Sequence, residues 1–112
     1  MPPPRLVQLE ARYSALRQEL AGIGYLSHGS VYRRPAGQPG NRFTWSTKVH
    51  AKTVSLALSE EQAAWLERAI AEHRRVQKIL VEMRRLSRQI MRARFPDTAR
   101  RSPLSKKVLR LI

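Results

Sequence analysis

The apolar positions near the start of the chain recur with a helical period. Intervals of three and four residues separate Leu6, Leu9, Tyr13, Leu16, Leu20 and Ile23. Side chains at this spacing share one face of a helix, so the pattern predicts an amphipathic helix over residues 5–22 that packs along another helix. We expect Gly22 and Gly24 to end it, because glycine readily adopts the left-handed conformation found at helix C-termini.

Further along the chain the helical period gives way to alternation of apolar and polar residues. The alternation predicts antiparallel strands over residues 30–34, 42–49 and 53–58. Residues 35–41 are rich in proline, glycine and asparagine and are expected to form the first connection. The second connection, residues 50–52, is short enough for a tight hairpin.

Alternate residues of a strand point to opposite faces of its sheet. One predicted face is apolar and is expected to meet the helices; it comprises Phe43, Trp45, Thr47, Val49, Val54, Leu56 and Leu58. The other is polar with basic ends and comprises Arg42, Thr44, Ser46, Lys48, Thr53, Ser55 and Ala57. We expect Phe43 and Trp45 to pack in the core, whereas core packing and base stacking are both open to Tyr32.

A capping box follows the last predicted strand, with Ser59 at the N-cap and Gln62 three residues on. A helix is predicted from there to Phe95 and Pro96, which end it. Its expected apolar stripe is Leu66, Ile70, Val76, Leu80, Met83, Leu86 and Ile90, with His73 nearby. At 1.5 Å per residue the helix is about 50 Å long, too long for a small sheet to cover. The first helix, a second copy of the chain or another protein's helix is expected to pack on it, as in a coiled coil.

The predicted fold is therefore α+β: an N-terminal helix, a small three-stranded antiparallel sheet, a long C-terminal helix and a basic tail. At 112 residues we expect one domain over residues 1–95, followed by a tail at 96–112 that forms at most a short helix. The absence of cysteine excludes disulfides and thiolate metal sites. Neither a signal peptide nor a stretch of 18 apolar residues occurs, so we expect a soluble, cytoplasmic protein.

Charge adds a functional prediction. The chain has 22 Lys and Arg against 8 Asp and Glu, a net charge of +14, and 17 of the basic residues are arginine. The guanidinium group matches phosphate oxygens and guanine edges, which favours nucleic acid as the partner. The candidate binding residues on the sheet are Arg33, Arg34, Arg42, Thr44, Ser46, Lys48 and Lys52. Those on the second helix and tail are Arg84, Arg85, Arg88, Arg92, Arg94, Arg100, Arg101, Lys106 and Lys107.

The second of these sets has no acid of its own between Glu82 and Asp97. Like charges so close together repel, so we expect an external polyanion to neutralise them. An anionic membrane is a less favoured partner for the basic and apolar residues 106–112. Catalysis and a cofactor are not expected, because the three histidines lack metal-ligand spacing and no phosphate-binding loop is present.

Several short motifs in order carry a family resemblance. They are the run at residues 29–34 (Gly-Ser-Val-Tyr-Arg-Arg), Pro39-Gly40, Lys52-Thr53-Val54 and His73-Arg74-Arg75. Over residues 5–92 the chain resembles a group of small bacterial proteins that carry a domain of unknown function and are often encoded near transposases and integrases. The resemblance implies a context of mobile DNA, without a mechanism. Members commonly carry cysteines between the first strands, where residues 36–40 here have none, so a metal role does not transfer.

The order of a small sheet followed by a helix is also similar to the arm-binding domains of phage-type integrases, which lay a three-stranded sheet in the major groove. The leading hypothesis is a non-catalytic DNA-binding accessory protein, nucleoid-associated, whose helices dimerise or dock on a recombinase. The alternative is an adaptor subunit of a larger protein or ribonucleoprotein complex that docks through its long helix. The sequence leaves the choice between DNA and RNA open.

Overall fold

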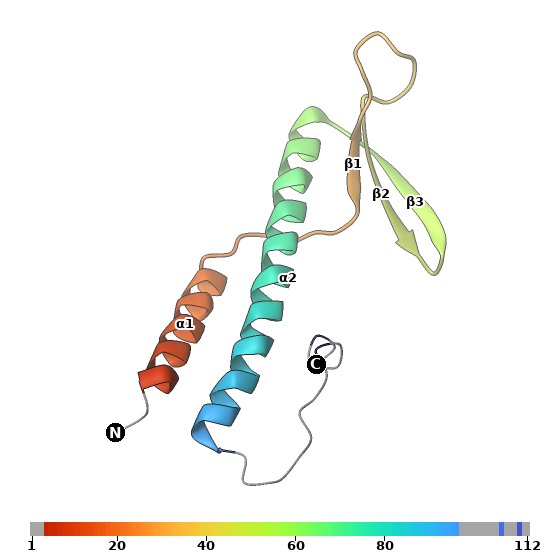
Figure 1. The fold of residues 1–112 in the computed structure, drawn as a ribbon. Helices are drawn as coiled ribbons and strands as arrows, with labels where there is room; N and C mark the ends of the chain where they lie inside the picture. Colours follow the sequence, from red (N-terminus) through yellow and green to blue (C-terminus); the bar gives the residue numbers. More distant parts are fainter. Residues whose placement is uncertain (1–3, 97–105, 107–109, 111–112) are drawn as a thin grey trace. The chain divides into compact units, whose positions relative to one another are not determined.

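The computed structural model describes residues 4–96, 106 and 110. Its elements follow the predicted order: α1 (Pro4–Ala21), β1 (Ser30–Arg33), β2 (Phe43–Val49), β3 (Lys52–Leu58) and α2 (Glu60–Arg94) (Figure 1). The α+β prediction is confirmed, and the strand boundaries lie within about one residue of those expected from the pattern. The described residues divide into two compact units, one of residues 23–77 and the other of the residues on either side of that range. The predicted helical turn in the tail falls largely outside the described residues.

The capping box at the start of α2 forms as predicted. The backbone N–H of Ser59 donates to Oε1 of Gln62 at 2.9 Å, and the backbone N–H of Gln62 donates to Oγ of Ser59 at 3.1 Å. Glu60 and Glu61 lie in the first turn, where negative charge offsets the helix dipole. These interactions satisfy N–H groups that have no partner within the helix, and they fix the residue at which α2 begins.

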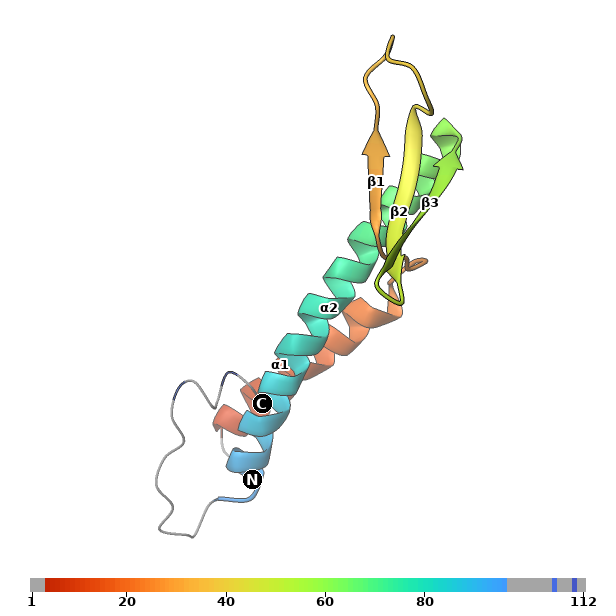
Figure 2. The same cartoon turned by 90° about the vertical axis from the view of Figure 1, so that its right-hand side faces the viewer.

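The unit of residues 23–77 contains the sheet, in which β2 lies between β1 and β3 and both pairings are antiparallel (Figure 2). Phe43 pairs with both Arg33 and Leu58, and this register fixes the side of the sheet on which every strand residue lies. The β2–β3 hairpin turns at His50 and Ala51, whose φ angles are 50° and 66°. Two positive φ angles are typical of the type I′ turn, which matches the twist of the strands.

The core of this unit is small and lies where the sheet meets the first part of α2. Its buried residues are Phe43, Ala63, Ala69 and Ile70. Two backbone groups attach the segment before β1 to the helix. The N–H of Gly24 donates to Oε2 of Glu72 at 3.0 Å, and the N–H of Ser27 donates to the carbonyl of Ala69 at 3.1 Å. The hydrogen bond from Gly24 is the main cause that lowers the pKa of Glu72 below its ordinary value.

The predicted apolar face of the sheet is only partly covered. Phe43 is buried, as expected, and Trp45 is half-buried. Val49, Val54 and Leu56 were expected to meet the helices, but they are 47%, 44% and 55% exposed. That expectation is wrong, because α2 starts at Glu60, two residues after Leu58, and shields the Phe43 end of the sheet rather than the hairpin end. A single helix, about 10 Å across, is too narrow to cover the whole face.

The other unit consists of α1 packed antiparallel to the part of α2 that begins at Lys78 (Figure 1). Leu6 is buried, and the rest of the predicted α1 stripe, Leu9, Tyr13, Leu16 and Leu20, is half-buried. On α2 the covered residues are Ile79, Met83, Leu86 and Ile90. Leu80, which was predicted on the stripe, is 44% exposed. The covered residues recur at intervals of four, three and four, and Leu80 falls outside that seam.

Candidate nucleic-acid interface

One face of the sheet is polar and open. The register places Tyr32 beside Thr44, Ser30 beside Ser46, and Lys48 beside Thr53. The pairing with Thr44 resolves the ambiguity of Tyr32 in favour of this face, where its side chain is 55% exposed. The residues of the polar face are Ser30, Tyr32, Thr44, Ser46, Lys48, Thr53, Ser55 and Ala57. No acid occurs between Glu19 and Glu60, so the strands contribute no negative charge to this surface.

The opposite face is identified by an ion pair between the sheet and α2. Arg33 pairs with Phe43 in the register, and its Nε donates to Oε1 of Glu67 at 3.0 Å. This hydrogen bond is the main cause that lowers the pKa of Glu67 and raises the pKa of Arg33. The guanidinium also lies over the Phe43 ring, at 5.2 Å from its centroid. Arg33 was predicted as a binding residue, but its side chain faces the helix and is turned away from the polar face.

Two further predicted arginines are engaged in the loop before β2. Nη1 of Arg34 donates to the carbonyl of Pro39 at 2.5 Å, and its backbone N–H donates to the carbonyl of Arg42 at 2.6 Å. Arg34 therefore closes the loop. Arg42 was expected within the strand on the polar face, but β2 begins at Phe43 and the Arg42 guanidinium lies 5.4 Å from the centroid of the Phe43 ring. Alternation alone does not fix the residue at which a strand begins, so the sequence could not place Arg42 outside β2.

The two lysines of the hairpin lie on opposite faces. Lys48 pairs with Thr53 and belongs to the polar face. Lys52 pairs with Val49 and so shares the side of Phe43 and Leu56. Of the basic residues within the paired strands, Lys48 is thus the one on the polar face. Thr44 and Ser46, which were also predicted as binding residues, lie beside it on the same strand and are half-buried.

A hydrogen bond and a ring contact that the sequence did not predict hold the start of β1 against β2. Nε1 of Trp45 donates to the carbonyl of His28 at 2.8 Å, and the two rings stack with centroids 6.2 Å apart. Gly29 makes the close approach possible: its φ is 90°, and a Cβ there would lie 2.5 Å from the carbonyl oxygen of Ser46. Gly29, directly before β1, is the feature of the sequence that could have indicated this close approach of the two strands.

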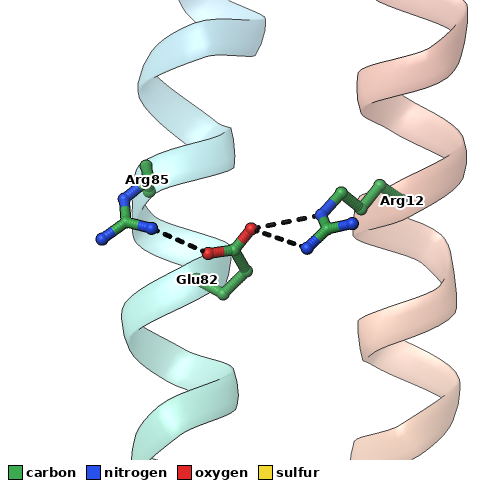
Figure 3. A network of polar contacts seen from close by, with 3 residues as sticks. All are labelled: Arg12, Glu82 and Arg85. Carbon is green, nitrogen blue, oxygen red and sulfur yellow. Dashed lines mark hydrogen bonds and ion pairs between the residues drawn. The ribbon is translucent and has the colours of Figure 1, made fainter.

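The basic cluster on α2 is partly neutralised within its own unit. Glu82 accepts hydrogen bonds from Arg12 of α1 and Arg85 of α2, each at 3.1 Å (Figure 3). Glu10 of α1 forms an ion pair with Arg94. Arg85 and Arg94 thus have acid partners within the chain. Glu82, an acid of α2 itself, pairs with Arg85 but is shared with Arg12, whereas Arg94 pairs with Glu10 of α1, one of the helices that the sequence left open as the partner of α2.

Two members of the cluster, Arg84 and Arg92, remain open. Arg84 and Arg92 are exposed and form no ion pair with any residue in the described ranges, and at an interval of eight they share one side of α2. Arg88 lies between them and is half-buried. In the predicted tail, Lys106 is exposed, whereas Arg100, Arg101 and Lys107 lie outside the described residues.

Other kinds of site find no support in the part of the chain that the structure describes. No group of three or more His, Asp or Glu residues there is arranged to hold a metal ion. None of its helices combines the length and the apolar character needed to cross a bilayer. Comparison of the chain with family models, curated proteins and solved structures gives no match. The resemblance to proteins encoded near transposases thus stays a prediction, and function is inferred from the residues themselves.

Proposed function

We propose that this chain is a non-catalytic accessory protein that binds duplex DNA. The observation that carries the proposal is the polar face of the sheet, which is free of acids, bears Lys48 and exposes Tyr32. The mobile-element context suggested by the resemblance belongs to the same proposal, with a recombinase or a second copy as protein partner.

The dimensions and chemistry of the polar face suit a groove. Strands lie about 4.8 Å apart, so the outer strands of three are separated by about 10 Å, comparable with the major groove's width of about 12 Å. The hydroxyl groups of Thr44, Ser46, Thr53 and Ser55 can each donate to or accept from base edges and phosphates. Small side chains in the centre of the face allow the backbone to approach the base pairs closely.

The open arginines of α2 supply the second part of the proposal. Arg84 and Arg92 present guanidinium groups to solvent from one side of the helix. Such groups bind phosphate without regard to sequence, so they contribute affinity, whereas the polar face contributes position and base preference. The paired residues Arg85 and Arg94 contribute less, because Arg94 pairs with Glu10 and Arg85 shares Glu82 with Arg12.

The experiment is a binding titration by fluorescence anisotropy with matched duplex DNA, single-stranded DNA and RNA across a salt series. We expect preference for the duplex and an affinity that falls steeply with salt, with a slope of about −0.9 per neutralised phosphate. The double substitution Arg84→Gln and Arg92→Gln should reduce the magnitude of that slope by about 2. Binding that is weak, without preference and independent of salt would contradict the proposal.

A second candidate function has one specific observation in its favour. Leu80, Val81 and Met91 of α2 are exposed although α1 packs on the same part of the helix. Exposed apolar residues on a helix are typical of a surface that another protein covers, as in an adaptor subunit. The behaviour of the purified chain without a protein partner distinguishes the two functions. A DNA-binding accessory protein binds duplex DNA alone, whereas an adaptor subunit stays soluble and ordered only with its partner.

A further inference from the structure

The outer edge of β3 is unprotected. No strand in the part of the chain that the structure describes pairs with its far side, and all residues of β3 except Leu58 are exposed. Edge strands are usually blunted by charged side chains, proline or bulges, because their free N–H and C=O groups invite another strand. β3 has a single charge, Lys52 at its first residue, and no proline. The other edge, β1, is only four residues long and ends in the charged Arg33.

We propose that β3 pairs antiparallel with β3 of a second copy of this chain, around a twofold axis at Ser55. The pairing joins two three-stranded sheets into one sheet of six strands. It uses backbone groups and side chains that the single chain leaves open. Six strands span about 24 Å, more than the major groove's width of about 12 Å, so the pairing belongs to the chain that is free of DNA. Three observations favour a second copy as the occupant of this edge: the alternation of hydrogen-bonding groups, the apolar side chains and the distribution of charge.

The hairpin determines which backbone groups point outward. A two-residue turn closes with a hydrogen bond between its flanking residues, here Val49 and Lys52. Hydrogen-bonded and non-bonded pairs alternate along an antiparallel ladder. Thr53, Ser55 and Ala57 therefore direct their N–H and C=O groups to the open edge. An axis at Ser55 sets Ser55 against its own copy and Thr53 against Ala57 of the second copy, so all of these outward groups are paired.

The side chains are complementary in this register. Val54 of one copy lies opposite Leu56 of the other, on the sheet side that also bears Phe43. Both are large apolar side chains that the single chain leaves 44% and 55% exposed. Apolar pairs directly across two strands stabilise a sheet, and the twofold axis creates this pair twice.

Charge favours the antiparallel orientation. The strand has Lys52 at its start and is followed, after Ser59, by Glu60 and Glu61 at the beginning of α2. All of these charged residues are exposed. In an antiparallel pair the start of one strand lies beside the end of the other, so Lys52 approaches the glutamates of the second copy. A parallel pair would place the two lysines side by side, where they repel.

The test uses the absence of cysteine from the chain. Ser55→Cys places one thiol on the proposed axis. The Cα atoms of a hydrogen-bonded antiparallel pair are about 5.5 Å apart, within the range that a disulfide spans. Ser46→Cys is the matched control, because Ser46 pairs with Ser55 and shares its face but lies on the central strand. Both variants are oxidised mildly and run on a non-reducing gel, and the mass of the unmodified chain is measured by light scattering.

We expect the unmodified chain to have twice its 12.9 kDa mass, Ser55→Cys to form a covalent dimer nearly completely, and Ser46→Cys to form little. Leu56→Lys should shift the mass towards the monomer by bringing charge to the apolar pair. A monomeric mass at all concentrations, or equal cross-linking of the two cysteine variants, would overturn the proposal. A dimer that Leu56→Lys leaves intact and that Ser55→Cys does not cross-link would do the same, and would point to the helices as the interface.

Discussion

Substitution of Gly29 by alanine provides a sensitive test of how the sheet is held together. Gly29 and Gly37 have nearly equal φ angles, 90° and 88°, so alanine meets the same backbone strain at both. That strain destabilises the folded state by about 1–2 kcal/mol. Alanine also lowers the conformational entropy of the unfolded chain, which offsets about 0.4–1 kcal/mol of this loss. A Cβ at position 37 meets nothing within 4 Å, so Gly37→Ala should cost about 1 kcal/mol.

At Gly29 the surroundings add to that strain. The new Cβ would lie 2.5 Å from the backbone oxygen of Ser46 and 2.8 Å from Nε1 of Trp45. Both belong to the central strand, which has little room to move. Overpacking of this kind costs about 1–3 kcal/mol, and the lost hydrogen bond from Trp45 to His28 about 1 kcal/mol more. Gly29→Ala should therefore destabilise the protein by about 3–5 kcal/mol.

The assay is thermal and urea unfolding of both variants, followed by circular dichroism and tryptophan fluorescence. The difference between them, at least about 2 kcal/mol, corresponds to a difference in Tm of about 10 °C in a domain of this size. Equal loss of stability in Gly29→Ala and Gly37→Ala would refute the close packing of β1 against β2. Crowding at residue 29 would then play no part in the stability of the sheet.

Three further predictions concern stability and use the same unfolding assays. Ala51→Gly should stabilise the hairpin by up to about 1 kcal/mol, because residue 51 has a positive φ that glycine adopts without strain. Ala57→Gly, in the regular part of β3, should instead destabilise by about 0.5–1 kcal/mol. A change of the same sign in both variants would contradict the positive φ at residue 51. Phe43→Ala should cost about 3–5 kcal/mol, since Phe43 is the one buried strand side chain among the described residues, and a loss under 1 kcal/mol would argue against the core. The pKa of Glu72 is lowered in the folded state, so the ionised carboxylate adds to the free energy of unfolding. This stabilisation is complete above the ordinary pKa of 4.5 and is lost as the pH falls below that value. Glu72→Gln should flatten this acid dependence in a urea series from pH 7 to pH 3, and Glu19→Gln serves as the control, because Glu19 is exposed and its side chain has no partner among the described residues.

Local patterns were sufficient to predict the elements of the fold. The capping box of Ser59 and Gln62 determined the start of α2, and Phe95 with Pro96 determined its end, because these signals act over a few residues. Strand alternation separated Lys48 from Phe43 correctly. The polar face could therefore be predicted as a surface, and its neutral members Thr44 and Ser46 were assigned correctly to it.

The roles of individual charged residues could not be predicted, because they depend on contacts between distant segments. Arg33 pairs with Glu67, 34 residues away, and Arg94 with Glu10, 84 residues away. Composition gives the number of such cations but not which of them an acid neutralises in the folded chain. The prediction that Leu80 is covered fails for a related reason. The spacing of apolar residues along α2 does not show which of them α1 covers.

The most direct test of the proposed function compares two lysines of one hairpin. Lys48 and Lys52 are both exposed and lie on opposite faces of the sheet. Affinity for duplex DNA is measured by anisotropy for the unmodified chain, Lys48→Ala and Lys52→Ala at one salt concentration. If the polar face binds DNA, Lys48→Ala should weaken binding several-fold and Lys52→Ala should have little effect. Equal loss in the two variants, or greater loss in Lys52→Ala, would contradict a DNA-binding role for the polar face.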